Sequence, residues 1–167
     1  MLISENYRSM SEEMHRTKPH YGDGSANHAE KIRAVAGKIG TTRILDYGAG
    51  KRALARALPE FEVASYDPGV PSISARPQPA PLVVCTDVLE HVEPYCLNSV
   101  LDDLRDLTLT ACFFTIHTGR AAKHLPDGRN AHLIQQPCEW WMLHLMSRWK
   151  VWNVTVAENG FIFIGAK

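Results

Sequence analysis

Apolar residues recur along the chain with two spacings, one typical of helices and one typical of buried strands. The segment 25–40 predicts a helix with Ser25 as its N-cap and Gly40 as its stop. The apolar residues of this segment share one helical face: Ile32, Val35, Ala36 and Ile39. Residues 7–16 predict a second helix closer to the N-terminus, which either packs on the core or covers a site.

From residue 43 onward, strand-like and helix-like runs alternate. Two short apolar runs, 43–47 and 61–67, flank a run at 51–58 whose alanines and leucines favour helix, which is the order of a βαβ unit. The proline-rich segment 68–81 predicts a surface loop. The alternation continues in the later runs: strand 81–87, helix 95–108, strand 111–118, helix 137–149 and hairpin strands 150–157 and 161–167. The pattern predicts a mostly parallel sheet that ends in an antiparallel hairpin turned at 158–160.

The chain of 167 residues has the size of one domain, with 18 Lys and Arg against 18 Asp and Glu. A polyanion would therefore need a local basic patch. No stretch approaches about 18 uninterrupted apolar residues and the N-terminus lacks a signal-peptide pattern, so we expect a soluble, cytoplasmic protein without a membrane partner. Four scattered cysteines support neither a disulfide framework nor a metal site, although a site from Cys138, His117 and His132 is an alternative.

Two glycines, Gly48 and Gly50, stand at a predicted strand-to-helix turn. Glycines here let the backbone approach a ligand, and the following helix offers free N–H groups. The sequence GAGKRA also satisfies the dinucleotide pattern, with Ala53 in the last place and Asp67 about 20 residues further on. Asp46, two residues before the first glycine, would repel a pyrophosphate and favour a ligand that carries an ammonium group.

The sequence ILDYGAG, the tripeptide YDP and the segment CTDVLEHVEP together resemble the class I, Rossmann-like S-adenosylmethionine-dependent methyltransferases. The resemblance runs from Ile44 to the C-terminus. It implies a three-layer αβα sandwich with a mostly parallel sheet and a C-terminal antiparallel hairpin, S-adenosyl-L-methionine as cofactor, and transfer of its methyl group. We accordingly expect one domain over 1–167, with an N-terminal helical or lid segment at 1–40 and the Rossmann-like core at 41–167.

The resemblance also implies residue roles. The glycine motif would line the methionine part of the cofactor, Asp67 would bind the ribose, and Glu90 and His91 would lie near the methyl group. The expected cofactor-binding residues come from these motifs: Asp46, Tyr47, Gly48, Gly50, Tyr66, Asp67, Pro68, Thr86, Asp87 and Val88. Two features depart from the family. Arg52 stands where a third glycine is frequent, and the loop 68–81 replaces a helix, a strand and a second helix, so the third-strand region and the adenine pocket are shortened.

The polar loop after the strand 111–118 is the expected acceptor side, since loops at the carboxyl ends of parallel strands bind ligands. Methyl transfer from a sulfonium needs an aligned nucleophile and, where required, a base for its proton. We expect His132 as general base, with His91 and Arg129 as further catalytic candidates, and we expect no metal. The alternative to a catalytic role is a structural one, in which each of these side chains braces its loop or helix by hydrogen bonds.

The expected acceptor is a small molecule or a modified nucleobase or nucleotide. A nucleic acid is an alternative through a local basic rim: Lys18, His20, Arg120, Lys123, His124 and Arg129. Two other functions stay open, namely a non-catalytic module that binds S-adenosylmethionine or S-adenosylhomocysteine, and a small NAD(P)-dependent reductase. The glycine-containing segment 20–28 is a candidate lid over the cofactor.

Overall fold

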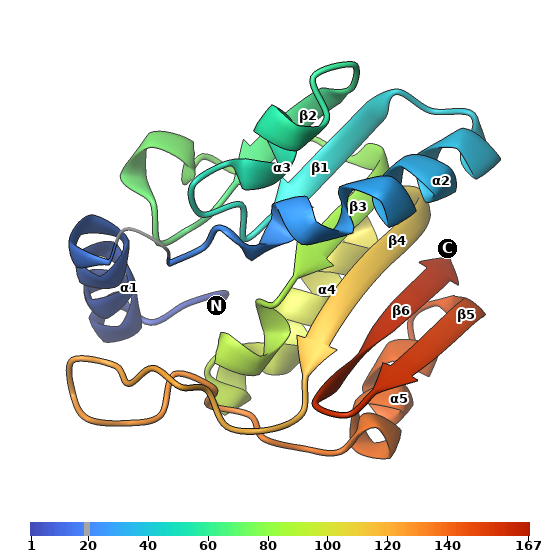
Figure 1. Ribbon diagram of the computed structural model, residues 1–167. Coiled ribbons are helices and arrows are strands. Elements are labelled where there is room, and N and C mark those ends of the chain that lie inside the picture. Colours follow the sequence, from blue (N-terminus) through green and yellow to red (C-terminus); the bar gives the residue numbers. More distant parts are fainter. Residues whose placement is uncertain (19–20) are drawn as a thin grey trace.

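The computed structural model describes residues 1–18 and 21–167. Six strands form one sheet in the order β2-β1-β3-β4-β6-β5 (Figure 1). The strands β2, β1, β3 and β4 are parallel, whereas β6 runs antiparallel to both β4 and β5. Their bounds are β1 (Arg43–Tyr47), β2 (Glu62–Tyr66), β3 (Ala80–Thr86), β4 (Thr108–His117), β5 (Lys150–Ala157) and β6 (Gly160–Ala166). The parallel α/β architecture and the C-terminal hairpin predicted from the sequence are confirmed.

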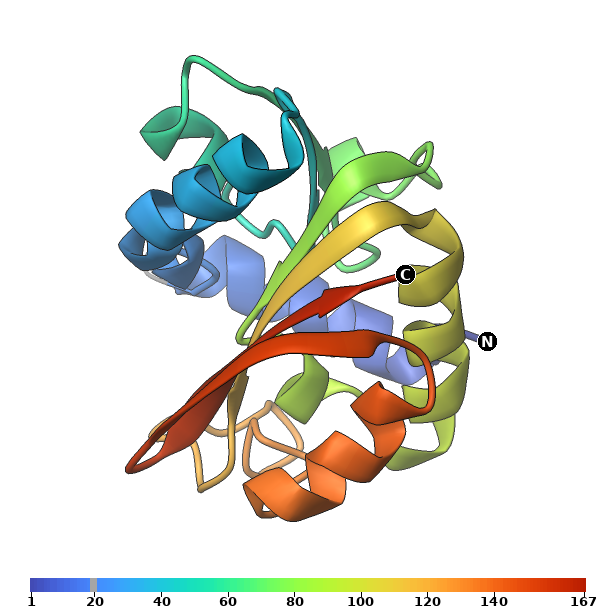
Figure 2. The same cartoon turned by 90° about the vertical axis from the view of Figure 1, so that its right-hand side faces the viewer.

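Helices cover both faces of this sheet, with α2 on one side and α4 and α5 on the other (Figure 2). The helices are α1 (Glu5–Thr17), α2 (Ala29–Ile39), α3 (Ala53–Ala57), α4 (Leu97–Leu107) and α5 (Cys138–Met146). Alternate residues of β3 face opposite sides, so Leu82 and Val84 pack with α2 and α3, whereas Val83 and Cys85 pack with α4 and α5. Burial on both faces explains the unbroken apolar run of β3. Among the described residues, no helix is both long and apolar enough to cross a membrane.

The helix predicted over 25–40 begins later than expected. Residues 24–28 form a 3-10 turn, and α2 starts after His28. Ser25 is therefore not the N-cap, and its buried hydroxyl has no hydrogen-bond partner among the described residues. Gly40 ends the helix as predicted, in the left-handed conformation with a φ of 67°.

The connection between β2 and β3 is short, as predicted. Residues 67–79 contain one 3-10 turn, Pro71–Ile73, as their only helical or strand element. The strand β2 consequently lies at the edge of the sheet. The preceding helix α3 is also shorter than the predicted 51–58, because Arg52 has a φ of 58° and such a residue cannot continue a right-handed helix.

Helix α1 lies beyond the carboxyl ends of the parallel strands rather than on either face of the sheet (Figure 1). Ser4 caps it by accepting a hydrogen bond from the N–H of Tyr7 at 3.1 Å. The N–H and hydroxyl of Ser4 donate in turn to the carboxylate of Glu93, at 2.8 and 2.7 Å. An apolar cluster also joins α1 to the loop after β4: Tyr7, Met10, Leu125 and Ala131. The N-terminal segment is thereby fixed across the strand ends.

Candidate functional site

The four parallel strands end at one edge of the sheet, and a polar residue or a glycine stands at each of these ends. Gly48 follows β1, Asp67 follows β2, Asp87 follows β3, and His117 ends β4. Parallel α/β sheets bind their ligands at this edge. The topology therefore gathers a glycine turn, two carboxylates and an imidazole from distant parts of the chain.

The glycine turn after β1 orients the carboxylate of Asp67. Gly48 and Gly50 have φ values of 80° and 47°, which L side chains rarely adopt. The N–H of Gly50 donates to Oδ2 of Asp67 at 3.0 Å, and the N–H of Gly69 donates to Oδ1 at 2.8 Å. The backbone of Gly22 lies directly on this turn, because a Cβ on Gly50 would come within 2.9 Å of the Gly22 carbonyl oxygen.

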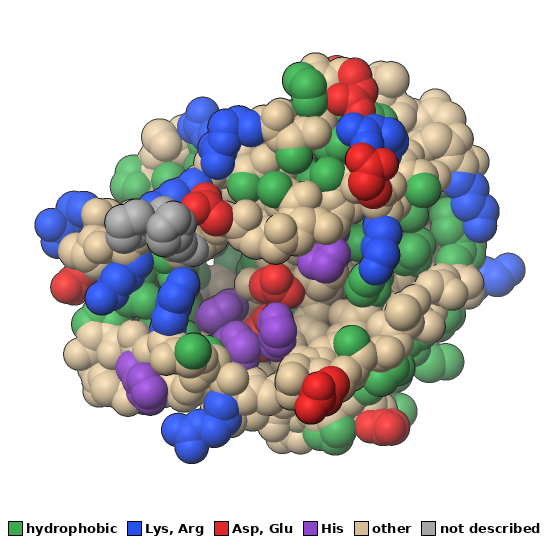
Figure 3. All heavy atoms as spheres, viewed as in Figure 1, with side chains coloured by type: hydrophobic (Ala, Val, Ile, Leu, Met, Phe, Trp, Pro, Cys, Tyr) green, Lys and Arg blue, Asp and Glu red, His purple; other side chains and the backbone are tan. Residues whose placement is uncertain are grey.

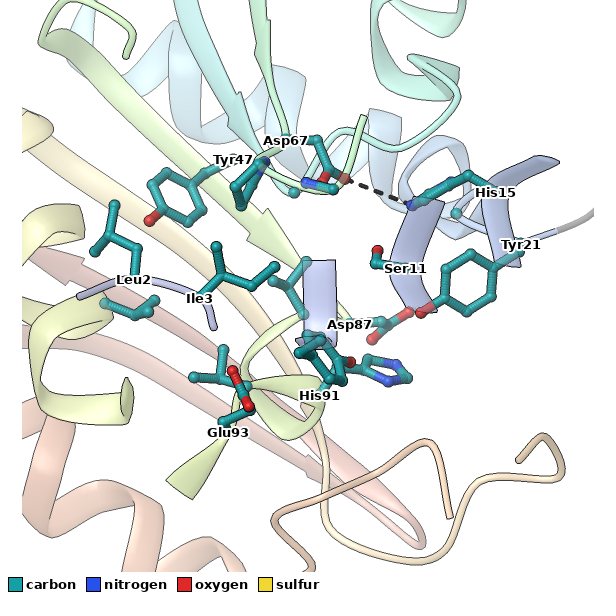
Figure 4. A pocket seen from close by; sticks show the side chains of 18 residues that line it. Leu2, Ile3, Ser11, His15, Tyr21, Tyr47, Asp67, Asp87, His91 and Glu93 are labelled. Atoms are coloured by element: carbon teal, nitrogen blue, oxygen red, sulfur yellow. Dashed lines mark hydrogen bonds and ion pairs between the residues drawn. The ribbon is translucent and has the colours of Figure 1, made fainter. Parts of the chain in front are cut away.

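A cavity of about 140 Å³ lies between this turn and α1 (Figure 4). Figure 4 shows Leu2 and Ile3 at one end of the cavity, and His15 and Tyr21 at the other, with Asp67 on the wall between them. The end at Leu2 and Ile3 is thus the more apolar one, although the Glu93 carboxylate also lies there, and the other end offers hydrogen-bonding groups.

His15 of α1 faces the Asp67 carboxylate across this cavity, with Nε2 3.9 Å from Oδ2. Burial lowers the pKa of His15, and the charge of Asp67 opposes that shift. Sequence reasoning did not assign His15, Ser11 or Leu2 to ligand binding, although all three line the cavity. The amphipathic pattern of residues 7–16 was the only local signal, because the position of α1 across the strand ends is a property of the whole fold.

Asp87 stands where the first cavity meets a second one. Its φ of 54° is unusual for a residue with a side chain, and such strained conformations concentrate at functional sites. The N–H of Asp87 donates to the carbonyl oxygen and to Oγ1 of Thr115, both at 3.0 Å. The Thr115 hydroxyl donates back to Oδ1 of Asp87 at 2.7 Å. These bonds over-determine the backbone and hold the carboxylate between the two cavities.

The second cavity, of about 380 Å³, lies beside the loop after β4. It shares five residues with the first: Tyr21, Gly22, Gly48, Asp87 and His91. Figure 3 shows a hollow at the centre of this face, in which histidine side chains gather next to acidic ones. The second cavity is therefore the more polar of the two and communicates with the first.

Three histidines, His91, His117 and His132, line the second cavity. The ring centroid of His132 lies 4.8 Å from that of His91 and 5.5 Å from that of His117. Nδ1 of His91 donates to the carbonyl oxygen of Ala131, and Nδ1 of His132 to that of Gly119, both at 2.7 Å. Burial lowers the pKa of His91 to about 4, and it also lowers the pKa of His132. Both rings are therefore neutral near pH 7, with the lone pair on Nε2.

Glu90 lies next to this histidine pair and has an exposed fraction of 0%. Its Oε1 accepts a hydrogen bond from the N–H of His117 at 3.0 Å, whereas Oε2 is buried without a hydrogen-bond partner among the described residues. Burial raises the pKa of Glu90 to about 8. The side chain thus places a carboxyl oxygen without a hydrogen-bond partner directly behind the histidine-lined wall.

Asp46 lies behind the glycine turn rather than at its mouth. Its exposed fraction is 1%, and neither carboxyl oxygen has a hydrogen-bond partner among the described residues. Burial, with a smaller contribution from the charge of Asp67, raises the pKa of Asp46 to about 7. Asp46 lines neither of the two cavities, so the direct ammonium contact expected from the sequence is not seen in this geometry.

Most of the predicted cofactor residues converge on the first cavity, where six line the wall: Tyr47, Gly48, Asp67, Pro68, Asp87 and Val88. Gly50 supports it through its hydrogen bond to Asp67, and Thr86 lines the second cavity. Tyr66 lines neither. It packs behind the wall against Tyr47, with ring centroids 4.9 Å apart.

The acceptor-side candidates separate into two groups. His91 and His132 line the second cavity, whereas Arg129 lines neither cavity and pairs with Asp127 at 2.7 Å in an exposed turn. Two members of the expected basic rim line the second cavity: Arg120 and Lys123. Two others line neither cavity: Lys18 and His124. His20 lies outside the described residues.

No protein-family model matches the chain, and no curated protein is significantly similar to it. Its fold, in contrast, is similar to the folds of proteins with solved structures. DhpI in complex with SAH has a TM-score of 0.61 and 20% identity, over 97% of this chain and 93% of DhpI. The 1,6-didemethyltoxoflavin-N1-methyltransferase of Burkholderia thailandensis, with its substrate and S-adenosylhomocysteine, has a TM-score of 0.64 and 14% identity, over 96% and 87%.

Magnesium protoporphyrin IX methyltransferase (ChlM) from Synechocystis PCC 6803, with bound SAM, has a TM-score of 0.61 and 11% identity, over 96% of both chains. At these identities the similarity lies in the fold. The mostly parallel sheet and the C-terminal antiparallel hairpin agree with what the sequence motifs predict. The chain has the fold of the class I S-adenosylmethionine-dependent methyltransferases.

Proposed function

We propose that this protein is an S-adenosylmethionine-dependent methyltransferase. The observation that carries the proposal is the junction of two cavities at Asp87 and His91, one under α1 and one beside the loop after β4. A methyl donor in the first cavity would present its sulfonium to an acceptor in the second. The bound SAM or SAH in structures of the same fold supports this choice of cofactor.

The Asp67 carboxylate is suited to a ribose. Each of its oxygens accepts one backbone N–H and keeps a lone pair for a ligand hydroxyl. The methionine part would then lie along Gly48, and adenine would lie toward the apolar end of the cavity near Leu2 and Val92. In this arrangement Leu2 and Ile3 form part of the cavity wall, to which the short connection after β2 contributes only its first residues, Pro68 and Gly69.

The acceptor would lie in the second cavity, against His91 and His132. Arg120 and Lys123 add positive charge to the same wall, which supports a small acceptor with an anionic group. A nucleic acid is less well supported, because Arg129 is paired with Asp127 and the formal net charge is zero. The four cysteines are free thiols, and this supports a reducing compartment such as the cytoplasm.

Isothermal titration calorimetry with S-adenosylmethionine and S-adenosylhomocysteine tests the cofactor. Asp67→Asn is expected to weaken binding by about 1–3 kcal/mol, or roughly 5- to 150-fold, because a ribose hydroxyl loses a charged acceptor. Asp127→Asn, in the exposed turn, is the matched control and is expected to bind as the wild type does. A wild-type protein that gives no heat at high micromolar ligand would exclude the methyltransferase function.

Turnover separates this function from its alternatives. Incubation of a metabolite extract with methyl-labelled cofactor, followed by mass spectrometry, is expected to show a labelled product that needs the protein. Cofactor binding without any labelled product would favour the non-catalytic binding module. Binding of NADH in place of S-adenosylmethionine would favour the reductase.

A further inference from the structure

Glu90, His91 and His132 bring three potential metal ligands together. One donor atom of each lies within 4.8 Å of the donor atoms of the other two. Glu90 and His91 belong to the 3-10 turn after β3, whereas His132 comes from the loop after β4. Cys138, which the sequence offered as an alternative ligand, does not belong to this group.

The two imidazoles are oriented as metal ligands usually are. A carbonyl oxygen can only accept, so the contacts to Ala131 and Gly119, both at 2.7 Å, place the ring proton of His91 and of His132 on Nδ1. Nε2 of each ring therefore carries a lone pair. A backbone carbonyl that fixes the tautomer in this way is the usual outer partner of a metal-bound histidine.

The carboxyl group of Glu90 supplies the second, independent observation. Its Oε2 is buried and has no hydrogen-bond partner in the described part of the chain, while Oε1 is held by the N–H of His117 at 3.0 Å. A buried carboxylate beside two imidazole lone pairs is costly unless a proton or a cation satisfies it. Once Glu90 gives up its proton, the carboxylate and the two Nε2 atoms are three acceptors that match a positive ion.

We propose that Glu90, His91 and His132 bind a divalent metal ion at the wall of the second cavity, where His91 and His132 are exposed to the cavity and Glu90 lies buried behind them. Two imidazoles and one carboxylate suit Mn²⁺, Fe²⁺, Co²⁺ or Zn²⁺, and such a three-ligand set leaves coordination positions open. Because His91 and His132 line the second cavity, an acceptor there can reach the open positions.

The role of the ion rests on the proposed methyltransferase function. A hydroxyl group of the acceptor that coordinates the ion has a lowered pKa and releases its proton to water. The acceptor oxygen then forms a bond to the methyl carbon, and the bond from that carbon to the sulfonium sulfur breaks with its electron pair going to sulfur. The products are a methyl ether, a thioether and one proton. The site thus selects oxygen acceptors and makes a separate general base unnecessary.

Metal binding is measured without substrate, on the full chain freed of metal by a chelator. Calorimetry with Mn²⁺ or Zn²⁺, and the visible spectrum with Co²⁺, are expected to show one equivalent bound. His132→Gln and Glu90→Gln are each expected to weaken binding by at least tenfold, since even outer partners of metal ligands have effects of roughly 10- to 100-fold. His124→Gln, an exposed histidine of the same loop, is the matched control and is expected to bind as the wild type does.

The outcomes separate this proposal from the proposed function. Absence of wild-type binding at 100-fold excess of Mn²⁺, Co²⁺ and Zn²⁺, or binding that His132→Gln leaves unchanged, overturns the metal site. The Co²⁺ spectrum of the wild type keeps the test valid if a variant fails to fold, because bands of an imidazole-ligated ion support the site and a spectrum of hydrated Co²⁺ contradicts it. S-adenosylhomocysteine binding is measured on the same samples. Metal binding without S-adenosylhomocysteine binding would support the metal site and contradict the methyltransferase function.

Discussion

Asp46 permits a quantitative test of how the glycine turn is built. Its carboxyl group is 1% exposed and has no hydrogen-bond partner among the described residues, and burial moves its pKa from 3.8 to about 7. The folded protein therefore keeps this proton between about pH 4 and pH 7, whereas the unfolded chain loses it. By linkage, the contribution of Asp46 to stability decreases as the pH rises through this window.

Asp46→Asn removes the titration while keeping the size of the side chain. A shift of about three pH units at about 1.4 kcal/mol per unit corresponds to about 4 kcal/mol. We expect the variant and the wild type to unfold with similar free energies at pH 4, and the variant to be more stable by up to about 4 kcal/mol at pH 8.

Urea unfolding of both proteins at pH 4, 6 and 8 measures this difference. Asp106→Asn, an exposed aspartate on α4, is the control and is expected to show no such dependence on pH relative to the wild type. A stability difference that stays constant from pH 4 to pH 8 would refute the reasoning. It would mean that the Asp46 carboxylate has a partner that stabilises its charge in the folded protein.

Three further variants test other parts of the fold. Arg52→Gly is expected to raise the Tm by about 2–4 °C, because glycine removes the cost of about 1 kcal/mol of a left-handed residue, and a lowered Tm would contradict this. Ser4→Ala removes the cap of α1 and one bond to Glu93, so amide exchange in α1 is expected to accelerate while that in α4 stays unchanged. Gly48→Ala is expected to cost about 1–3 kcal/mol, because its Cβ would lie 2.3 Å from Val88, and Val88→Ala in the same chain is expected to restore part of the loss in urea unfolding. If the double variant recovers no stability, the loss comes from the φ of 80° at position 48 alone.

The features that sequence reasoning predicted are those set by local chemistry. The apolar run of β3, the glycines after β1 and the short connection after β2 each follow from a few neighbouring residues. The orphaned carboxyl of Glu90 and the approach of His132 to His91 do not. They arise because the loop after β4 folds back under α1, and this contact joins segments that no local pattern connects.

The left-handed residues show the same limit. Gly48 and Gly50 signal their conformation by lacking a side chain, whereas Arg52 adopts the same region without any such signal. The absence of a third glycine was visible in the sequence, but the retained backbone shape was not. The presence of a glycine therefore predicts a left-handed residue, whereas the absence of a glycine does not exclude one.

The apolar cluster between α1 and the loop after β4 has a kinetic consequence. Tyr7 and Met10 contribute to this cluster from α1, and Leu125 and Ala131 contribute from the loop. The helix beside the first cavity and the loop beside the second therefore share one packed contact. Displacement of α1 disturbs that contact and loosens both cavities together. Ligand exchange in the two cavities would then depend on the same motion of α1, so slow opening of α1 would limit release from both cavities at once.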